Sequence, residues 1–113
     1  MAGKLVLVIE DDRTLQDSVR KLVESEGFKV VTARSLPEAM QILERIARPC
    51  LILLDTLMQE GRSAMARLGA HYPMATIPVR VSATNVRRIS KRTVQLEVLR
   101  DLIVQHCGQA QSS

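Results

Sequence analysis

The stretch Leu51-Ile52-Leu53-Leu54-Asp55 places an acidic residue directly after an unbroken apolar run. Four consecutive aliphatic residues, with no polar residue between them, are typical of a strand that is buried on both faces in the middle of a parallel sheet. Pro49 separates this run from the helical pattern before it, because proline ends a helix. We therefore predict that Asp55 lies at the carboxyl end of a central strand.

Strand-like and helix-like segments alternate along the rest of the chain. Apolar runs predict strands over 4–9, 28–33, 51–54, 77–82 and 86–90. Apolar residues at helical spacing predict helices from 15 to 26, from 36 until Pro49, from 62 to 71 and from 94 to 106. This alternation is the pattern of an α/β domain whose parallel strands are joined by right-handed crossovers.

Two helix starts carry capping signals. Asp12 stands just before the first helical pattern, where a carboxylate can accept from the free N–H groups of the first turn. The sequence Ser35-Leu36-Pro37-Glu38 has the spacing of a capping box, with proline in the first turn.

Length and composition favour a single domain over residues 1–113, with a frayed polar tail at 108–113. No apolar run is long enough to cross a membrane, and no secretory signal precedes the first strand. We therefore expect a cytoplasmic protein without membrane contact. In that compartment Cys50 and Cys107 are expected to be reduced thiols.

The net charge of +4 arises in the second half of the chain, where Arg87, Arg88, Lys91 and Arg92 form a basic cluster. Such a cluster indicates an acidic partner or a nearby phosphoryl group, or it is simply a solvated surface. We expect no nucleic acid partner, because the chain has few aromatic residues and no recognisable DNA-binding motif.

Polar residues follow three predicted strands at their carboxyl ends, where the functional crevice of an open parallel sheet lies. Glu10 and Asp11 follow the first strand, Asp55 follows the third, and Ser82 ends the fourth. Three carboxylates at one edge would repel one another unless they share a hard cation such as Mg²⁺. Glu10 and Asp11 alone fit helix capping equally well, whereas Asp55 has no nearby helix to cap.

Three segments, Leu7-Val8-Ile9-Glu10-Asp11-Asp12, Leu51-Ile52-Leu53-Leu54-Asp55 and Ile77-Pro78-Val79 through Ser82-Ala83, resemble the motif blocks of response-regulator receiver domains, in order and nearly in spacing. The match covers residues 4 to 83. It implies a flavodoxin-like, doubly wound sheet of five parallel strands in the order 2-1-3-4-5.

The resemblance implies a phosphoryl-accepting site. Asp55 would be the nucleophile that takes a phosphoryl group from a histidine kinase or a phosphotransfer protein. Ser82 would donate a hydrogen bond to a phosphoryl oxygen, and Lys91 would bring positive charge to it. Beyond this self-phosphorylation and autodephosphorylation, the resemblance implies no dedicated enzyme acting on small molecules.

The resemblance also implies a Mg²⁺ site beside Asp55. Asp11 would bind the ion directly and Glu10 mainly through water, while Asp55 and the backbone carbonyl of Leu57 would complete the protein ligands. Mg²⁺ suits a partly hydrated site with few carboxylates. Phosphoryl transfer needs positioning and charge neutralisation more than it needs a proton shuttle.

The chain departs from the family between Ser82 and Lys91, where the family has a whole fourth helix and this chain has too few residues for one. We infer that this helix is missing or reduced to a turn. The family's Lys-Pro pair appears as Lys91-Arg92, and its aromatic switch position falls on Arg88. Arg92 or Arg88 could replace Lys91 at the phosphate, because a guanidinium also pairs with phosphate.

Three functions are compatible with these residues. The first is a phosphoryl-accepting signalling domain, either a stand-alone regulator or a phosphate shuttle. The second is a degenerate receiver that binds a partner without being phosphorylated, which the missing helix favours and the retained acids oppose. The third, a small flavodoxin-like enzyme or nucleotide binder, is disfavoured because no glycine-rich phosphate loop follows the first strand.

The missing helix should leave apolar surface uncovered near Ile77, Val79, Val81 and residues 86–89. Exposed apolar surface of this kind marks an interface. We therefore expect a homodimer, or a tight complex with a partner, through the edge of strands four and five, with Arg87, Arg88 and Arg92 at its rim.

Overall fold

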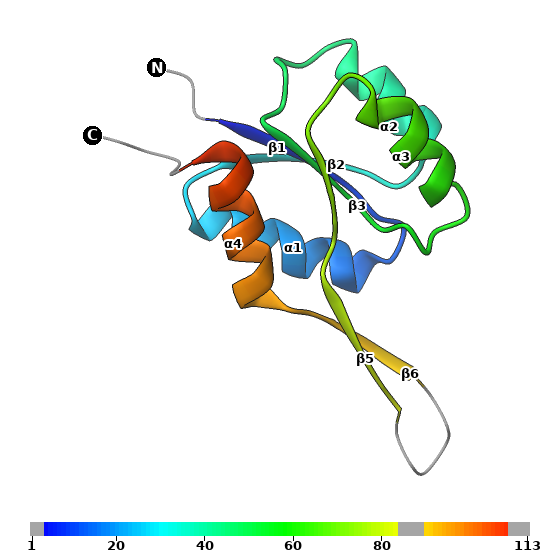
Figure 1. Ribbon diagram of the computed structural model, residues 1–113, viewed down its shortest axis with the longest axis vertical. Helices are drawn as coiled ribbons and strands as arrows, with labels where there is room; N and C mark the ends of the chain where they lie inside the picture. The colour runs from blue at the N-terminus through cyan, green and yellow to red at the C-terminus, as the bar shows by residue number, and fades with distance from the viewer. Residues whose placement is uncertain (1–3, 84–89, 109–113) are drawn as a thin grey trace.

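The computed structural model describes residues 4–83 and 90–108, in which a parallel sheet lies between helices and a separate hairpin extends away from it (Figure 1). No helix in this part of the chain is long and apolar enough to cross a membrane. In chain order the elements are β1 (Leu5–Ile9), α1 (Arg13–Ser25), β2 (Lys29–Ala33), α2 (Leu36–Leu43), β3 (Leu51–Leu54), α3 (Gly61–Gly69), β4 (Met74–Thr76), β5 (Val79–Ala83), β6 (Ser90–Val94) and α4 (Leu96–Cys107).

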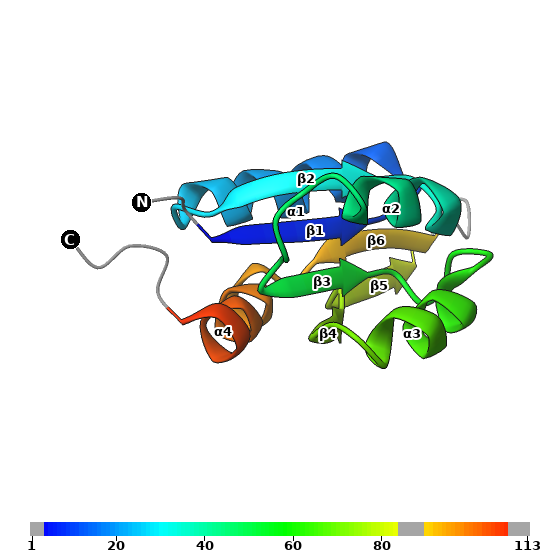
Figure 2. The ribbon, with the colours of Figure 1, turned by 90° about the horizontal axis from the view of Figure 1, so that it is seen from above.

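Four strands form the parallel sheet, in the order β2-β1-β3-β4. Figure 2 shows β2, β1 and β3 side by side, with their arrowheads at the same end. Every residue of β3 is fully buried, as its unbroken apolar sequence predicts. The flavodoxin-like α/β class, the central position of this strand and the order of the first four strands are confirmed.

Each face of the sheet has its own core, because successive residues of a strand point to opposite faces. On one face, Val6 and Leu51 pack with buried residues of α1 and α4. On the other, Leu7 and Ile52 pack with buried residues of α2 and α3. This two-sided burial explains why β1 and β3 are apolar at every position.

Over the described residues the sheet has four strands, whereas five were predicted. The fourth strand of the sheet is Met74–Thr76 rather than 77–82, and β5 leaves the sheet after Pro78 to pair antiparallel with β6. A parallel return needs a crossover of about a dozen residues or more. The chain between β5 and β6 is only residues 84–89, which is too short for that crossover, so a hairpin forms instead.

Residues 84–89, the whole segment between β5 and β6, lie outside the described part of the chain, so the structure does not test directly whether a helix is missing there; their number alone is too small for a crossover helix. Most of the expected strand over 86–90 lies outside the described residues, and β6 begins at Ser90.

The helix starts follow the predicted caps, but one helix end does not follow its prediction. The Asp12 carboxylate accepts from the N–H groups of Thr14 and Leu15, and Ser35 Oγ accepts from the N–H of Glu38 at 3.2 Å. The second helix ends at Leu43, well before Pro49. Ala47, which lies in the range predicted for this helix, is exposed.

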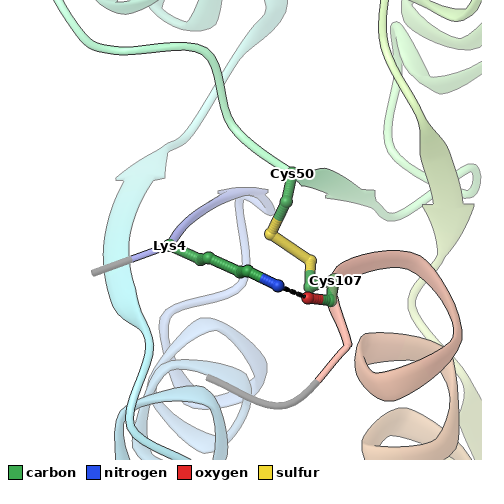
Figure 3. The surroundings of a disulfide bond; sticks show 3 residues. All are labelled: Lys4, Cys50 and Cys107. Carbon is green, nitrogen blue, oxygen red and sulfur yellow. Dashed lines mark hydrogen bonds between the residues drawn. A yellow bond between two sulfur atoms is a disulfide. The ribbon is translucent and has the colours of Figure 1, made fainter. Parts of the chain in front are cut away.

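A disulfide joins Cys50 to Cys107, with 5.4 Å between their Cα atoms (Figure 3). Cys50 directly precedes β3 and Cys107 ends α4. The expectation of two reduced thiols is therefore wrong for this structure. The cause lies in the path of α4, which packs across the sheet and brings its last residue to the start of β3.

Candidate functional site

Two acidic side chains are buried at the carboxyl end of the sheet. Glu10 follows β1 and has no exposed surface, while Asp55 follows β3 and is 2% exposed. They meet because Ile9 and Leu54, the residues before them, are partners in the parallel register. No other charged side chain among the described residues is buried. Buried carboxylates at the functional edge of a parallel sheet mark a candidate site.

Asp11 adds a third carboxylate, which is exposed. Carboxylate oxygens of Glu10, Asp11 and Asp55 lie within 4.8 Å of one another. The structure thus brings together the three acids that end β1 and β3, and we call them the acidic cluster.

Glu10 is held by the backbone that follows it. Its Oε2 accepts from the N–H of Asp11 at 2.9 Å and from the N–H of Asp12 at 3.3 Å, whereas its Oε1 is buried without a hydrogen-bond partner. Burial raises the pKa of Glu10 to about 8, and the neighbouring Asp55 carboxylate adds to the rise. Glu10 therefore tends to keep its proton at neutral pH.

Asp55 is held in the opposite state. Its Oδ1 accepts from the N–H of Leu57 at 2.9 Å, and its Oδ2 accepts from Arg92 Nη2 at 2.7 Å. Burial alone would raise the pKa of Asp55, but the hydrogen bonds from Arg92 and Leu57 outweigh it, so the pKa lies below its ordinary value. Asp55 is therefore an ionised carboxylate at neutral pH.

Arg92 reaches the acidic cluster from β6 of the hairpin. Besides its bond to Asp55, its Nη2 lies 3.9 Å from Glu10 Oε1. The bond to Asp55 raises the pKa of Arg92 above its ordinary value, so the guanidinium stays charged. Of the two arginines that could replace Lys91, the structure brings Arg92 to the site, while Arg88 lies outside the described residues.

The structure does not test the roles predicted for three other site residues. Ser82 of β5 and Lys91 of β6 are partners in the register of the hairpin, but their side chains lie outside the described part of the chain, so their roles stay predictions. Leu57 contacts Asp55 through its N–H, and its predicted use of the carbonyl toward a metal also stays a prediction.

Two residues that were not among the predicted site residues support the site. Gln16 Nε2 donates to the carbonyl oxygens of Glu10 at 2.9 Å and Ala33 at 3.3 Å, which ties α1 to the ends of β1 and β2. At Gly61 a Cβ would lie 2.6 Å from the backbone of Thr56, so only glycine lets α3 begin this close to the loop after Asp55. A glutamine at a helix start carries no recognisable signal of such a contact.

The acidic cluster has the donor set of a site for a hard divalent cation. Carboxylate oxygens are the ligands that Mg²⁺ prefers. The unpartnered Oε1 of Glu10 is a buried acceptor, which a cation or a water bound to it would satisfy. Arg92 lies against two of the same carboxylates, so its guanidinium and a metal ion would compete for them.

Comparison with known proteins gives one family. The family model described as "Response regulator receiver domain" matches residues 6–104. No curated protein sequence matches the chain.

Several solved structures share the fold. A response regulator from Thermotoga maritima is 24% identical with a TM-score of 0.58, over 67% of this chain and 66% of that chain. A response regulator receiver protein from Pseudomonas putida is 25% identical with a TM-score of 0.57, over 68% and 69%. The response regulator StyR is 22% identical with a TM-score of 0.63, over 96% and 61%. The matched regions thus span 61% to 69% of these proteins.

Proposed function

The chain belongs to the response regulator receiver domain family, which acts in two-component signal transduction, and from that premise we propose that Asp55 accepts a phosphoryl group in a Mg²⁺-dependent reaction. The phosphoryl donor is the phosphohistidine of a histidine kinase or a phosphotransfer protein. The signal passes on through protein contacts.

The observation that carries the proposal is the state of Asp55. It is buried at the carboxyl edge of the sheet, yet Arg92 and the N–H of Leu57 favour its ionised form. An ionised carboxylate is the nucleophilic form. One of its oxygens attacks the phosphorus of phosphohistidine, the P–N bond breaks, and Asp55 carries an acyl phosphate.

Glu10, Asp11, Asp55 and the carbonyl of Leu57 would hold Mg²⁺. The ion supplies positive charge to the oxygens of the transferred phosphoryl group. The protein's own part is to orient Asp55 between two hydrogen-bond donors and to keep bulk water away from its buried carboxylate.

We assign the cationic contact of the phosphoryl group to Arg92 rather than to Lys91. Arg92 already contacts the nucleophile, and its planar guanidinium can donate two hydrogen bonds to phosphate oxygens. Ser82 remains the proposed donor to a further phosphoryl oxygen.

The proposal includes a cytoplasmic location, where kinases of this class deliver their phosphoryl groups, and no nucleic acid partner. It also includes a homodimer through the open edge of β4 and the hairpin. Among the described residues β4 pairs only with β3, so its other edge presents free backbone groups.

A second candidate, an unphosphorylated binding module, is favoured by one observation: Arg92 already occupies the carboxylate that a phosphoryl donor must reach. Incubation with Mg²⁺ and a small phosphodonor such as acetyl phosphate, followed by intact mass measurement, separates the two. The proposal expects one added phosphoryl group on the wild type and none on Asp55→Asn. An unmodified wild type would leave the binding module as the better account.

A further inference from the structure

The Cys50–Cys107 disulfide fastens the last element of the fold to its centre. Cys50 is the residue before β3, the strand that leads to Asp55, and Cys107 is the last residue of α4, the helix that follows β6 and Arg92. Figure 3 shows the bond together with Lys4, whose Nζ donates to the carbonyl oxygen of Cys107. The disulfide thus joins the segment that leads to Asp55 to the segment that follows Arg92.

The noncovalent hold on α4 is narrow. Only Leu99, Ile103 and Cys107 of this helix are buried, whereas the large apolar side chains of Leu96, Val98 and Val104 are between 44% and 49% exposed. The buried residues form a single stripe, and its last member, Cys107, is also one half of the disulfide. The carboxyl end of α4 is therefore held by this buried cysteine together with its covalent bond.

We propose that this disulfide is a reversible redox tether, opened by a small thiol such as glutathione or by a dithiol protein, which controls how firmly α4 and the adjoining β6 are held. Cys50 is half-buried and Cys107 is 4% exposed, so Cys50 is the more exposed of the two residues and the one we expect a thiol to attack. The tether does not depend on phosphoryl transfer, and its test is separate from that of the proposed function.

The exchange proceeds in two balanced steps. A thiolate attacks the sulfur of Cys50, which forms a mixed disulfide and releases the thiolate of Cys107, and that thiolate takes a proton from water. A second thiolate attacks the thiol-derived sulfur of the mixed disulfide, which releases Cys50. The protein disulfide gains two electrons, and two thiols are oxidised to one external disulfide.

The tether reaches the candidate site through a short path. Only Gln95 separates α4 from β6, and its N–H donates to the carbonyl oxygen of Pro78 at 2.9 Å. Two residues before the end of β6, Arg92 bonds to Asp55. When α4 loosens, β6 loses its anchor on this side, and the contact between Arg92 and Asp55 weakens.

Amide hydrogen exchange on the full chain tests the tether, with disulfide status read by thiol alkylation and mass. In a series of glutathione buffers under native conditions, the disulfide should give way to two thiols within the series. The reduced protein should exchange the amides of α4 at least about tenfold faster and those of β6 faster than the oxidised protein, with β1 and β2 nearly unchanged. Its Tm should be lower by about 10 °C or more, as expected for opening a long loop.

The control is the double variant Cys50→Ala, Cys107→Ala, which keeps the sites apolar. It should exchange like the reduced wild type and ignore the redox buffer. A disulfide that never forms, or one that opens only in denaturant, would overturn the proposal. Equal α4 exchange in the oxidised and reduced proteins would overturn it as well, and faster exchange of α4 with β6 unchanged would remove the link to Arg92.

Discussion

Arg92 Nη2 donates a 2.7 Å hydrogen bond to Asp55 Oδ2, which joins two residues that are 37 positions apart. The contact places a cation of the protein itself on a carboxylate that would otherwise need a metal ion to offset its charge. It also makes the hairpin part of the candidate site. The electrostatic state of the acidic cluster therefore depends on where β6 lies.

Arg92→Ala should destabilise the metal-free protein by roughly 1–3 kcal/mol, because it leaves Asp55 buried without its cation. Mg²⁺ should recover part of that loss, since it neutralises the same carboxylates. Urea unfolding with and without Mg²⁺ measures both effects. Arg80→Ala, an exposed arginine on the partner strand of the hairpin, is the matched control and should change little. An equal loss of unfolding free energy in the two variants would show that Arg92 has no special role at Asp55.

The free energy of unfolding should fall as the pH rises from about 5 to about 8. The pKa of Glu10 is 4.5 in the unfolded chain and about 8 in the fold, so between these values the folded state binds more protons. Stability then decreases with pH, by at least about 1.4 kcal/mol, the equivalent of one pKa unit. The lowered pKa of Asp55 acts in the other direction, but only below pH 3.8, outside this window.

Urea unfolding at a series of pH values measures this slope. Glu10→Gln keeps the shape of the side chain without its titration, and it should flatten the slope. The same slope in both proteins would show that Glu10 is already ionised in the fold.

Asp11→Asn should weaken Mg²⁺ binding more than Glu10→Gln does. Asp11 is exposed and faces solvent, whereas Oε2 of Glu10 already accepts two backbone N–H groups. NMR shift titrations with Mg²⁺ compare the two, with Asp17→Asn on α1 as a control that should bind like the wild type. Equal weakening in the Asp11 and Glu10 variants would rule out the division of roles between them.

The chain should associate with itself through β4 and the hairpin. Val81 of β5 is 56% exposed, as expected for a strand without a covering helix, although Ile77 proves to be buried at 1% exposure. The expectation for residues 86–89 lies outside the described residues. Sedimentation velocity over a concentration series should show a dimer, and Val81→Lys should weaken it. A monomer at high concentration, for the wild type, would refute the interface.

The sequence predicts the structure best where a local pattern is compatible with only one arrangement. The apolar runs of β1 and β3 require two-sided burial, which sets the sheet order at its centre and brings Glu10 beside Asp55. The hairpin was missed, although the short segment between Val79–Ala83 and Ser90–Val94 leaves too few residues for a parallel crossover. The disulfide could not be foreseen, since it depends on where α4 ends in space, 57 positions after Cys50.

The most direct test of the central claim is to locate the phosphoryl group chemically. The protein is incubated with Mg²⁺ and acetyl phosphate, treated with borohydride, which reduces an aspartyl phosphate to homoserine, and then mapped by peptide mass spectrometry. The account predicts homoserine at position 55 in the wild type, and none in Asp55→Asn or without phosphodonor. Homoserine at another aspartate, or none in the wild type, would contradict it.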